Sequence, residues 1–376
     1  MIYFDNASTT KILDKTKKKY IKYLDEFYNA SSPYSKGIEQ KRAINKSRNV
    51  ISNALGCEGS ELFFAASATE FNNIIIKGTL RSSKKDEYIF SSGEHSSIYE
   101  ISRQILSMGY TVHYIGLNKD GSVNLDELKE KVNNNTRLVS IIHCSNETGN
   151  VNDIKKASEI IKSINPKTIF HSDGVQAFLK INVNVKFLGV DAYTISGHKC
   201  YSPKGVAAAY INNKVKLTSL IAGGGQEFGI RSGTENTAAI AAFAKTVEEL
   251  YDKIELNKKR VLFLNKKLCT LIRSGIDDIV INTDIENPYI INLIIKGVKS
   301  EVLINMLDEK NIYVGSGSSC SNNGNSINRV LDSAGYSKVD QKNSIRISLG
   351  IYNTEEEVIE FTKVLKNMVE RIRNLL

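Results

Sequence analysis

Short apolar runs alternate with segments of helical pattern through the first half of the chain. The runs lie at 62–64, 87–91, 111–117, 138–144, 168–172 and 190–195. Parallel strands need long crossover connections, which are usually helices and nearly always right-handed. The alternation therefore predicts an α/β fold with a large, mainly parallel sheet.

Polar side chains follow four of these runs, namely His95, Asn146, Asp173 and Lys199. In open α/β sheets the reactive groups gather at the carboxyl ends of the strands. Each residue alone has a plainer explanation: Asn146 and Asp173 are also suitable helix caps, His95 also suits a surface loop, and Ser-Gly before His198 also suits an ordinary turn. Four such residues at four strand ends favour a shared site.

Lys199 follows a buried run and small polar residues, an arrangement that can form a Schiff base with a carbonyl cofactor. Pyridoxal 5′-phosphate (PLP) would need further groups. Its ring nitrogen needs an anionic partner, predicted to be Asp173. Its ring face needs a stacking partner, predicted to be His95, which would also carry protons. Asn146 and Gln176 are predicted to lie beside its phenolic oxygen.

Small residues separate the first apolar run from the helix that follows it, which predicts a helix N-terminus able to bind a phosphate. Thr69 and the backbone of Ala68 would contribute there, with Ser196 and His198 completing the phosphate site. Simple capping of this helix by Ser67 or Thr69 is the alternative, and it does not exclude phosphate binding.

The composition changes after a long helical region that runs from 236 to about 273. We predict a large domain at 15–255, and a smaller α+β domain formed by 1–14 and 256–376. The smaller domain contains a segment rich in Gly, Ser and Asn at 315–326, which we expect to be mobile. It carries Cys320, either as a reactive thiol or as an incidental loop cysteine.

The remaining cysteines and most histidines are interpreted as structural. No Cys-x-x-Cys pair occurs, which argues against a disulfide framework, a zinc knuckle or another metal site. We expect four cysteines to act as small core residues and three histidines to be satisfied within apolar strands: Cys57, Cys144, Cys200 and Cys269, and His113, His143 and His171.

The bulk composition is that of a globular chain of 376 residues, with 41% hydrophobic and 24% charged residues. No apolar run approaches the ~20 residues that a membrane span needs, and the first residues lack a signal pattern. We therefore expect a cytoplasmic protein without membrane contact. The net charge of +9 is spread along the chain without interleaved aromatics, so we expect no direct nucleic-acid binding.

An ordered series of motifs resembles the NifS/IscS-like cysteine desulfurases, a group with the class V aminotransferase fold (fold type I of PLP-dependent transferases). The series comprises FDNASTT, SATEFNN, GEHSS, SNETGN, HSDGVQ, SGHK followed by PKG, GGGQEFGIRSGT, GSGSSC and IRISLG. Each motif is modest, but the ordered set spans nearly the whole chain and is highly specific.

The resemblance implies a PLP enzyme that releases alanine from L-cysteine and carries the sulfur on Cys320 as a persulfide. Lys199 would hold the cofactor, and Arg346 with Asn146 would bind the substrate. Thr234 would reach the phosphate of a neighbouring subunit, which implies a homodimer. The acceptor would be an iron–sulfur scaffold, a tRNA-thiolation pathway or another sulfur carrier. A selenocysteine lyase or another class V aminotransferase-like enzyme is the alternative.

Overall fold

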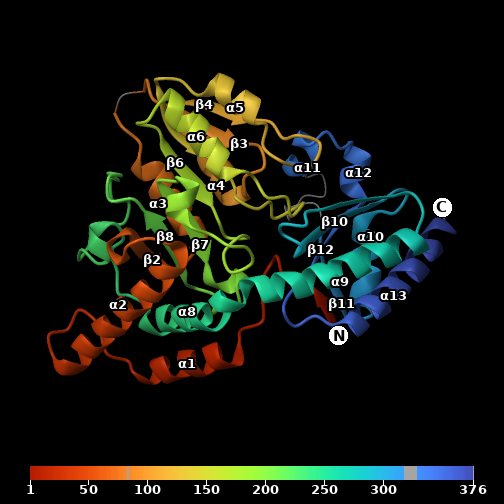
Figure 1. The fold of residues 1–376 in the computed structure, drawn as a ribbon, viewed down its shortest axis with the longest axis horizontal. Helices are drawn as coiled ribbons and strands as arrows, with labels where there is room; N and C mark the ends of the chain where they lie inside the picture. The colour runs from red at the N-terminus through yellow and green to blue at the C-terminus, as the bar shows by residue number, and fades with distance from the viewer. Residues whose placement is uncertain (83, 317–327, 376) are drawn as a thin grey trace.

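The computed structural model describes residues 1–82, 84–316 and 328–375. These residues form a seven-stranded sheet in the order β2-β8-β7-β6-β5-β3-β4 and a five-stranded sheet in the order β1-β11-β12-β10-β9. Figure 1 shows the two sheets in separate parts of the molecule, with both chain ends beside the smaller one.

The large sheet is mainly parallel, as predicted, because β4, β3, β5, β6 and β7 pair in parallel. The exception is β8, which pairs antiparallel with β7 and β2 and was not predicted. The strands are β2 (Leu62–Ala65), β3 (Glu87–Ser91), β4 (Thr111–Ile115), β5 (Thr136–Ser140), β6 (Ile169–Asp173), β7 (Ala192–Ser196) and β8 (Ala207–Ile211).

Helices cover both faces of the large sheet. Strand residues alternate between the faces: Ile89 packs into the core on one side, whereas Tyr88 and Phe90 pack on the other. The first face is covered by α2 (Ser35–Leu55), α5 (Leu125–Lys131), α6 (Ile154–Ile164), α7 (Val185–Leu188) and α8 (Thr237–Leu250), and the second by α3 (Ala68–Gly78) and α4 (Ser96–Ser107). Helix α1 (Asp14–Asp25) lies along α8 (Figure 1).

The smaller sheet has helices against one face and the site against the other. Its strands are β1 (Ile2–Phe4), β9 (Ile279–Thr283), β10 (Ile290–Ile295), β11 (Ile312–Ser316) and β12 (Ser344–Ser348). The helices on that face are α9 (Ile254–Gly275), α10 (Ser300–Asp308) and α13 (Glu355–Arg373). Two short helices, α11 (Arg329–Ser333) and α12 (Lys338–Lys342), follow β11 in the chain and contribute no residue to this core. Ile345 and Ile347 of β12 join the core beneath the helices, so Arg346 between them points to the opposite face.

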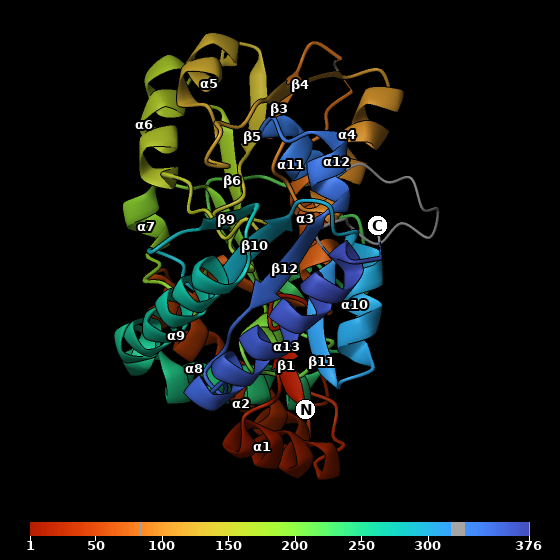
Figure 2. The ribbon, with the colours of Figure 1, turned by 90° about the vertical axis from the view of Figure 1, so that its right-hand side faces the viewer.

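Residues from distant parts of the sequence meet in this smaller sheet. Strand β1 pairs in parallel with β11, and Figure 2 shows it as a red strand among blue C-terminal elements. The pairing carries the residues that follow β1 from the smaller sheet towards the large one. This arrangement places the N-terminal residues between the two sheets.

The long helical region that we predicted after residue 236 is interrupted. Helix α8 ends at Leu250, a 3₁₀ turn spans Tyr251–Lys253, and α9 begins at Ile254. Leu250 and Ile254 belong to the core of the large sheet, whereas Val261 belongs to the core of the smaller one. The division into 15–255 and 1–14 with 256–376 stays a proposal, which this separation of cores supports.

The C-terminal end of α2 has a glycine cap. Gly56 follows α2 in the left-handed conformation, with φ 72°, and caps its last carbonyls. Further 3₁₀ turns lie at Gly59–Glu61, Gly197–Lys199 and Glu227–Gly229. Within the described ranges, no helix combines the length and apolar character that crossing a membrane requires.

Candidate active site

Lys199 lies in the 3₁₀ turn that directly follows β7. The turn is tight, since a Cβ on Gly197 would come within 2.9 Å of Val206 Cγ1. The Lys199 Nζ donates hydrogen bonds to two backbone carbonyls, Ala7 O at 2.6 Å and Ser8 O at 2.7 Å. The predicted cofactor lysine is therefore held against the N-terminal residues.

The electrostatic surroundings of Lys199 favour its neutral amine. Burial lowers the pKa of Lys199 to about 7, and the positive charges of Arg346 and Lys180 add to this effect. Asp5 and Asp173 oppose it. An amine with a pKa near neutrality can act as a nucleophile and as a proton carrier, whereas an ordinary lysine is almost fully charged there.

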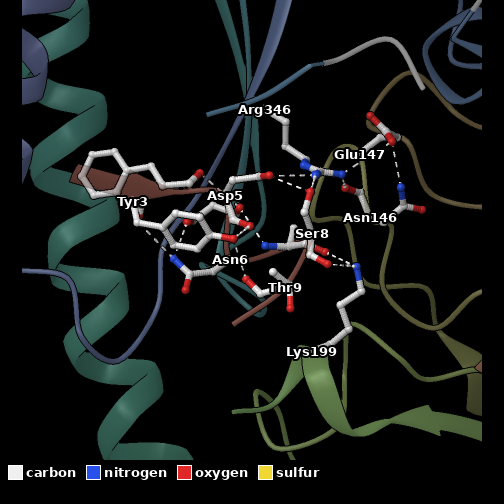
Figure 3. A network of polar contacts seen from close by, with 12 residues as sticks. Tyr3, Asp5, Asn6, Ser8, Thr9, Asn146, Glu147, Lys199 and Arg346 are labelled. Atoms are coloured by element: carbon white, nitrogen blue, oxygen red, sulfur yellow. Dashed lines mark hydrogen bonds and ion pairs between the residues drawn. The ribbon is translucent and has the colours of Figure 1, made fainter. Parts of the chain in front are cut away.

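Residues 5–10, here called the N-terminal segment, connect several of the predicted site residues (Figure 3). Gln176 Nε2 donates to Ala7 O at 2.9 Å, so this carbonyl is shared with Lys199. The Thr10 Oγ1 hydroxyl donates to His198 O at 3.0 Å, and Thr9 Oγ1 lies 3.3 Å from His198 Nδ1. The segment thus forms one wall of the candidate site.

Arg346 reaches the same wall from β12. Its Nη2 donates to Ser8 Oγ at 2.7 Å and to Asp5 Oδ1 at 3.0 Å, and its Nη1 donates to Asn146 O at 3.0 Å (Figure 3). Its Nε is buried and has no partner among the described residues. Gly315 faces Arg346 across the strands, and a Cβ there would lie 3.0 Å from Nε, so glycine leaves room for the guanidinium.

Asp173 is buried at the end of β6 and is held by two donors. The amide of Val175 donates to Oδ1 at 3.0 Å, and Asn72 Nδ2 donates to Oδ2 at 3.2 Å. Burial raises the pKa of Asp173, and the His95 ring and these hydrogen bonds oppose that rise. A buried carboxylate held in this way is a suitable partner for a protonated ring nitrogen.

His95 lies at the N-terminus of α4, in the connection that follows β3, as predicted. Its side chain is solvent-accessible, yet protein atoms crowd its other sides. Burial among them lowers the pKa of His95, and Asp173 opposes this effect.

The other predicted cofactor residues are spread around this centre. Gln176 and Ser196 are buried, and Asn146 is half-buried with its Nδ2 donating to Glu147 Oε1 at 2.7 Å. Burial, with positive neighbours, lowers the pKa of His198 to about 4. Three residues of the predicted phosphate site lie nearer the surface, with Ala68 half-buried and Thr69 and Thr234 exposed.

The structural predictions for cysteines and histidines were mostly confirmed. Cys144, Cys200 and Cys269 are buried, and Cys57 is half-buried. His143 and His171 are buried and hydrogen-bonded. The prediction that His113 is a core residue was wrong, because β4 is an edge strand and leaves the ring half-exposed beside Glu87, with Nε2 at 3.0 Å from Oε2. Cys320 and most of 315–326 lie outside the described residues.

Sequence reasoning missed roles for four residues that organise the site: Asp5, Ser8, Asn72 and Ser97. All four lie within the motifs quoted above, FDNASTT, SATEFNN and GEHSS. Their position in these motifs was the available signal, and Asp5 also follows the short apolar strand β1.

The donor set fits PLP. Lys199 offers an amine to the aldehyde, buried Asp173 offers an anion to the ring nitrogen, and His95 has an accessible face for stacking. The N-terminus of α3, with Ala68 and Thr69 in its first turn, offers backbone N–H groups and a positive partial charge to the phosphate.

Comparisons with known proteins agree with this chemistry. The family model described as aminotransferase class-V matches residues 2–361. The chain belongs to this family. It is 36% identical to cysteine desulfurase IscS of Buchnera aphidicola and 34% identical to a cysteine desulfurase of Nostoc sp., covering 100% of this chain and 94% of each relative.

A solved structure of a NifS-like protein is 32% identical, with a TM-score of 0.92 over 98% of this chain and 99% of that one. The resemblance to NifS/IscS-like desulfurases and the class V fold are therefore confirmed. As a class-V family member the chain is an enzyme, and PLP is its cofactor.

Proposed function

We propose that this enzyme is a cysteine desulfurase that converts L-cysteine into L-alanine and a protein-bound persulfide. One observation carries the proposal beyond the family: Lys199 and Arg346 converge on a single residue, Ser8. The Lys199 amine binds its carbonyl at 2.7 Å, and the Arg346 guanidinium binds its hydroxyl at 2.7 Å. A carboxylate held by the guanidinium would lie beside the amine, which suits an α-amino acid.

Bound PLP supplies an electron sink for the α-carbon of the substrate. The residues of the chain supply binding and proton handling. Arg346 binds the substrate carboxylate, for which a planar guanidinium is well shaped. Lys199, with its pKa lowered to about 7, takes and returns a proton at Nζ. Asp173 keeps its negative charge against the ring nitrogen.

We propose that the thiol of Cys320, which lies outside the described residues, accepts the substrate sulfur as a persulfide. The S–S bond forms as the C–S bond of the substrate breaks, and the β-carbon keeps the electron pair and takes up a proton, so that alanine leaves. Attack requires the thiolate, and a free cysteine has a pKa near ~8.5. We further propose a cytoplasmic homodimer in which Thr234 of one subunit contributes to the phosphate site of the other. The persulfide would pass to an iron–sulfur scaffold or another sulfur carrier.

The proposal is tested by incubating the purified PLP-loaded enzyme with L-cysteine and a thiol reductant. We expect alanine and sulfide in equal amounts, and a Cys320→Ser variant that releases almost no sulfide. Borohydride reduction of the loaded enzyme should attach the cofactor to Lys199, identified by peptide mass. A Cys57→Ser variant is the matched control and should retain sulfide release.

Two results would overturn the assignment. Strong preference for selenocysteine over cysteine would indicate a selenocysteine lyase, and turnover with a keto acid acceptor would indicate an aminotransferase. Full sulfide release by Cys320→Ser would reject the role of that thiol while leaving the desulfurase assignment in place.

A further inference from the structure

The His95 side chain caps helix α4 in a way that fixes its proton. The backbone N–H of Ser97 donates to His95 Nδ1 at 3.1 Å. A backbone N–H has no lone pair to accept with, so Nδ1 must present its own lone pair. The single ring proton of neutral His95 therefore lies on Nε2.

A second contact leads from the same nitrogen to Asp173. Ser97 Oγ lies 2.9 Å from His95 Nδ1 and accepts from Asn72 Nδ2 at 2.9 Å. Asn72 Nδ2 also donates to Asp173 Oδ2 at 3.2 Å. A carboxylate accepts hydrogen bonds and does not donate them, so it orients the Asn72 amide with its NH₂ group towards Asp173.

With the Asn72 amide oriented in this way, each hydrogen-bonding proton between Asp173 and His95 has a single position. The Asn72 amide donates one N–H to Asp173 and the other to Ser97 Oγ. Because Nδ1 accepts from the Ser97 N–H and carries no proton, the Ser97 hydroxyl is the donor in its contact with Nδ1, and the two donors share one lone pair. Asn72 is fully buried in α3, so the amide lies in a fixed environment rather than in solvent.

We propose that Asn72 and Ser97 are positioning residues that hold His95 as a neutral ring with its proton on Nε2, ready to donate from that atom. The inference deepens the proposed function and rests on it, because it assumes an anionic Asp173 and a His95 that faces the reacting groups. It also narrows the role predicted from the sequence: His95 begins the reaction as a donor and not as a base.

Burial and three of the four charged groups that face His95 favour the same neutral state. Asp173 on β6 favours the protonated imidazolium, whereas Lys199 after β7, Arg329 on α11 and Arg346 on β12 disfavour it. The positive partial charge at the N-terminus of α4 disfavours it further. Burial and the three positive side chains outweigh Asp173 and lower the pKa of His95, in agreement with the hydrogen-bond geometry.

The test is an NMR titration of PLP-loaded enzyme labelled with ¹⁵N-histidine. The chain has five histidines, and a His95→Gln variant identifies the His95 signals. We expect an unprotonated, hydrogen-bonded Nδ1 and a protonated Nε2. Ser97→Ala removes one hydrogen bond to the neutral ring, so the titration midpoint of His95 should rise by about one pH unit.

Ser97→Thr keeps the hydroxyl and should restore the wild-type titration. Ser96→Ala alters the exposed neighbouring serine and should leave the titration midpoint of His95 unchanged. A protonated Nδ1 in the wild type, or the same midpoint in Ser97→Ala as in Ser96→Ala, would overturn the inference. Sulfide release is assayed separately, so an enzyme that fails on L-cysteine but shows the expected nitrogen signals would reject the proposed function alone.

Discussion

Among the ion pairs of the described residues, that of Arg48 and Glu227 should be the costliest to break. Arg48 of α2 binds Glu227 through two parallel hydrogen bonds, Nη2 to Oε1 at 2.7 Å and Nη1 to Oε2 at 2.8 Å. The backbone N–H of Phe64 also donates to Oε2, at 2.8 Å. The side chains are 7% and 2% exposed. Loss of either partner therefore leaves the other charge buried without a counter-charge and without water.

Arg48→Met removes the guanidinium and leaves the Glu227 carboxylate buried with the Phe64 amide. Removing one member of a buried pair costs about 3–5 kcal/mol, so we expect a loss of that size in the free energy of unfolding. Glu227→Gln combined with Arg48→Met removes both charges. The double variant should therefore be more stable than the sum of the two single losses predicts, by at least about 1 kcal/mol.

Urea unfolding followed by far-ultraviolet circular dichroism measures these values, since the chain has no tryptophan. Arg103→Met is the matched control, because Arg103 pairs with Glu100 at 3.5 Å on the exposed side of α4 and should leave the urea midpoint almost unchanged. Equal midpoints for Arg48→Met and Arg103→Met, or strict additivity in the double variant, would refute the reasoning.

Three further predictions concern buried groups near the site. Burial raises the pKa of Glu94 from 4.5 to about 8, so stability should fall as pH rises through that window, and Glu94→Gln should remove this part of the fall in urea midpoints. Burial lowers the pKa of Lys180 from 10.5 to about 8, so stability should rise between these values, and Lys180→Met should flatten that rise in the same assay. The ring of Tyr193 packs directly on Gly174, so the methyl group of Gly174→Ala should cost about 1–3 kcal/mol, measured by urea unfolding.

Local patterns predicted much of the fold because the length of a strand, the period of a helix and the capping of its ends depend on residues that are close together in the sequence. The strand at 87–91 and the strand before Lys199 are examples. Strand β8 was missed because its sequence, AAAYI, is rich in alanine, which favours helix, and becomes a strand through pairing on both sides.

The site was only partly predictable for a different reason. Asp173 and Lys199 could be proposed from their positions after apolar runs. The contacts of Asp5 and Ser8 with Arg346 join residues more than 330 positions apart, and no local pattern encodes such contacts. The same holds for Asn72, whose amide reaches Asp173 from another element.

The pairing of β1 with β11 has a consequence for biosynthesis. The ribosome makes β11 roughly 300 residues after β1, a delay of about 15 to 60 s at ordinary translation rates. Throughout that interval β1 is an unpaired strand that could join another nascent polypeptide. The wall that touches Lys199 is therefore completed late in translation, and stable cofactor loading should follow it.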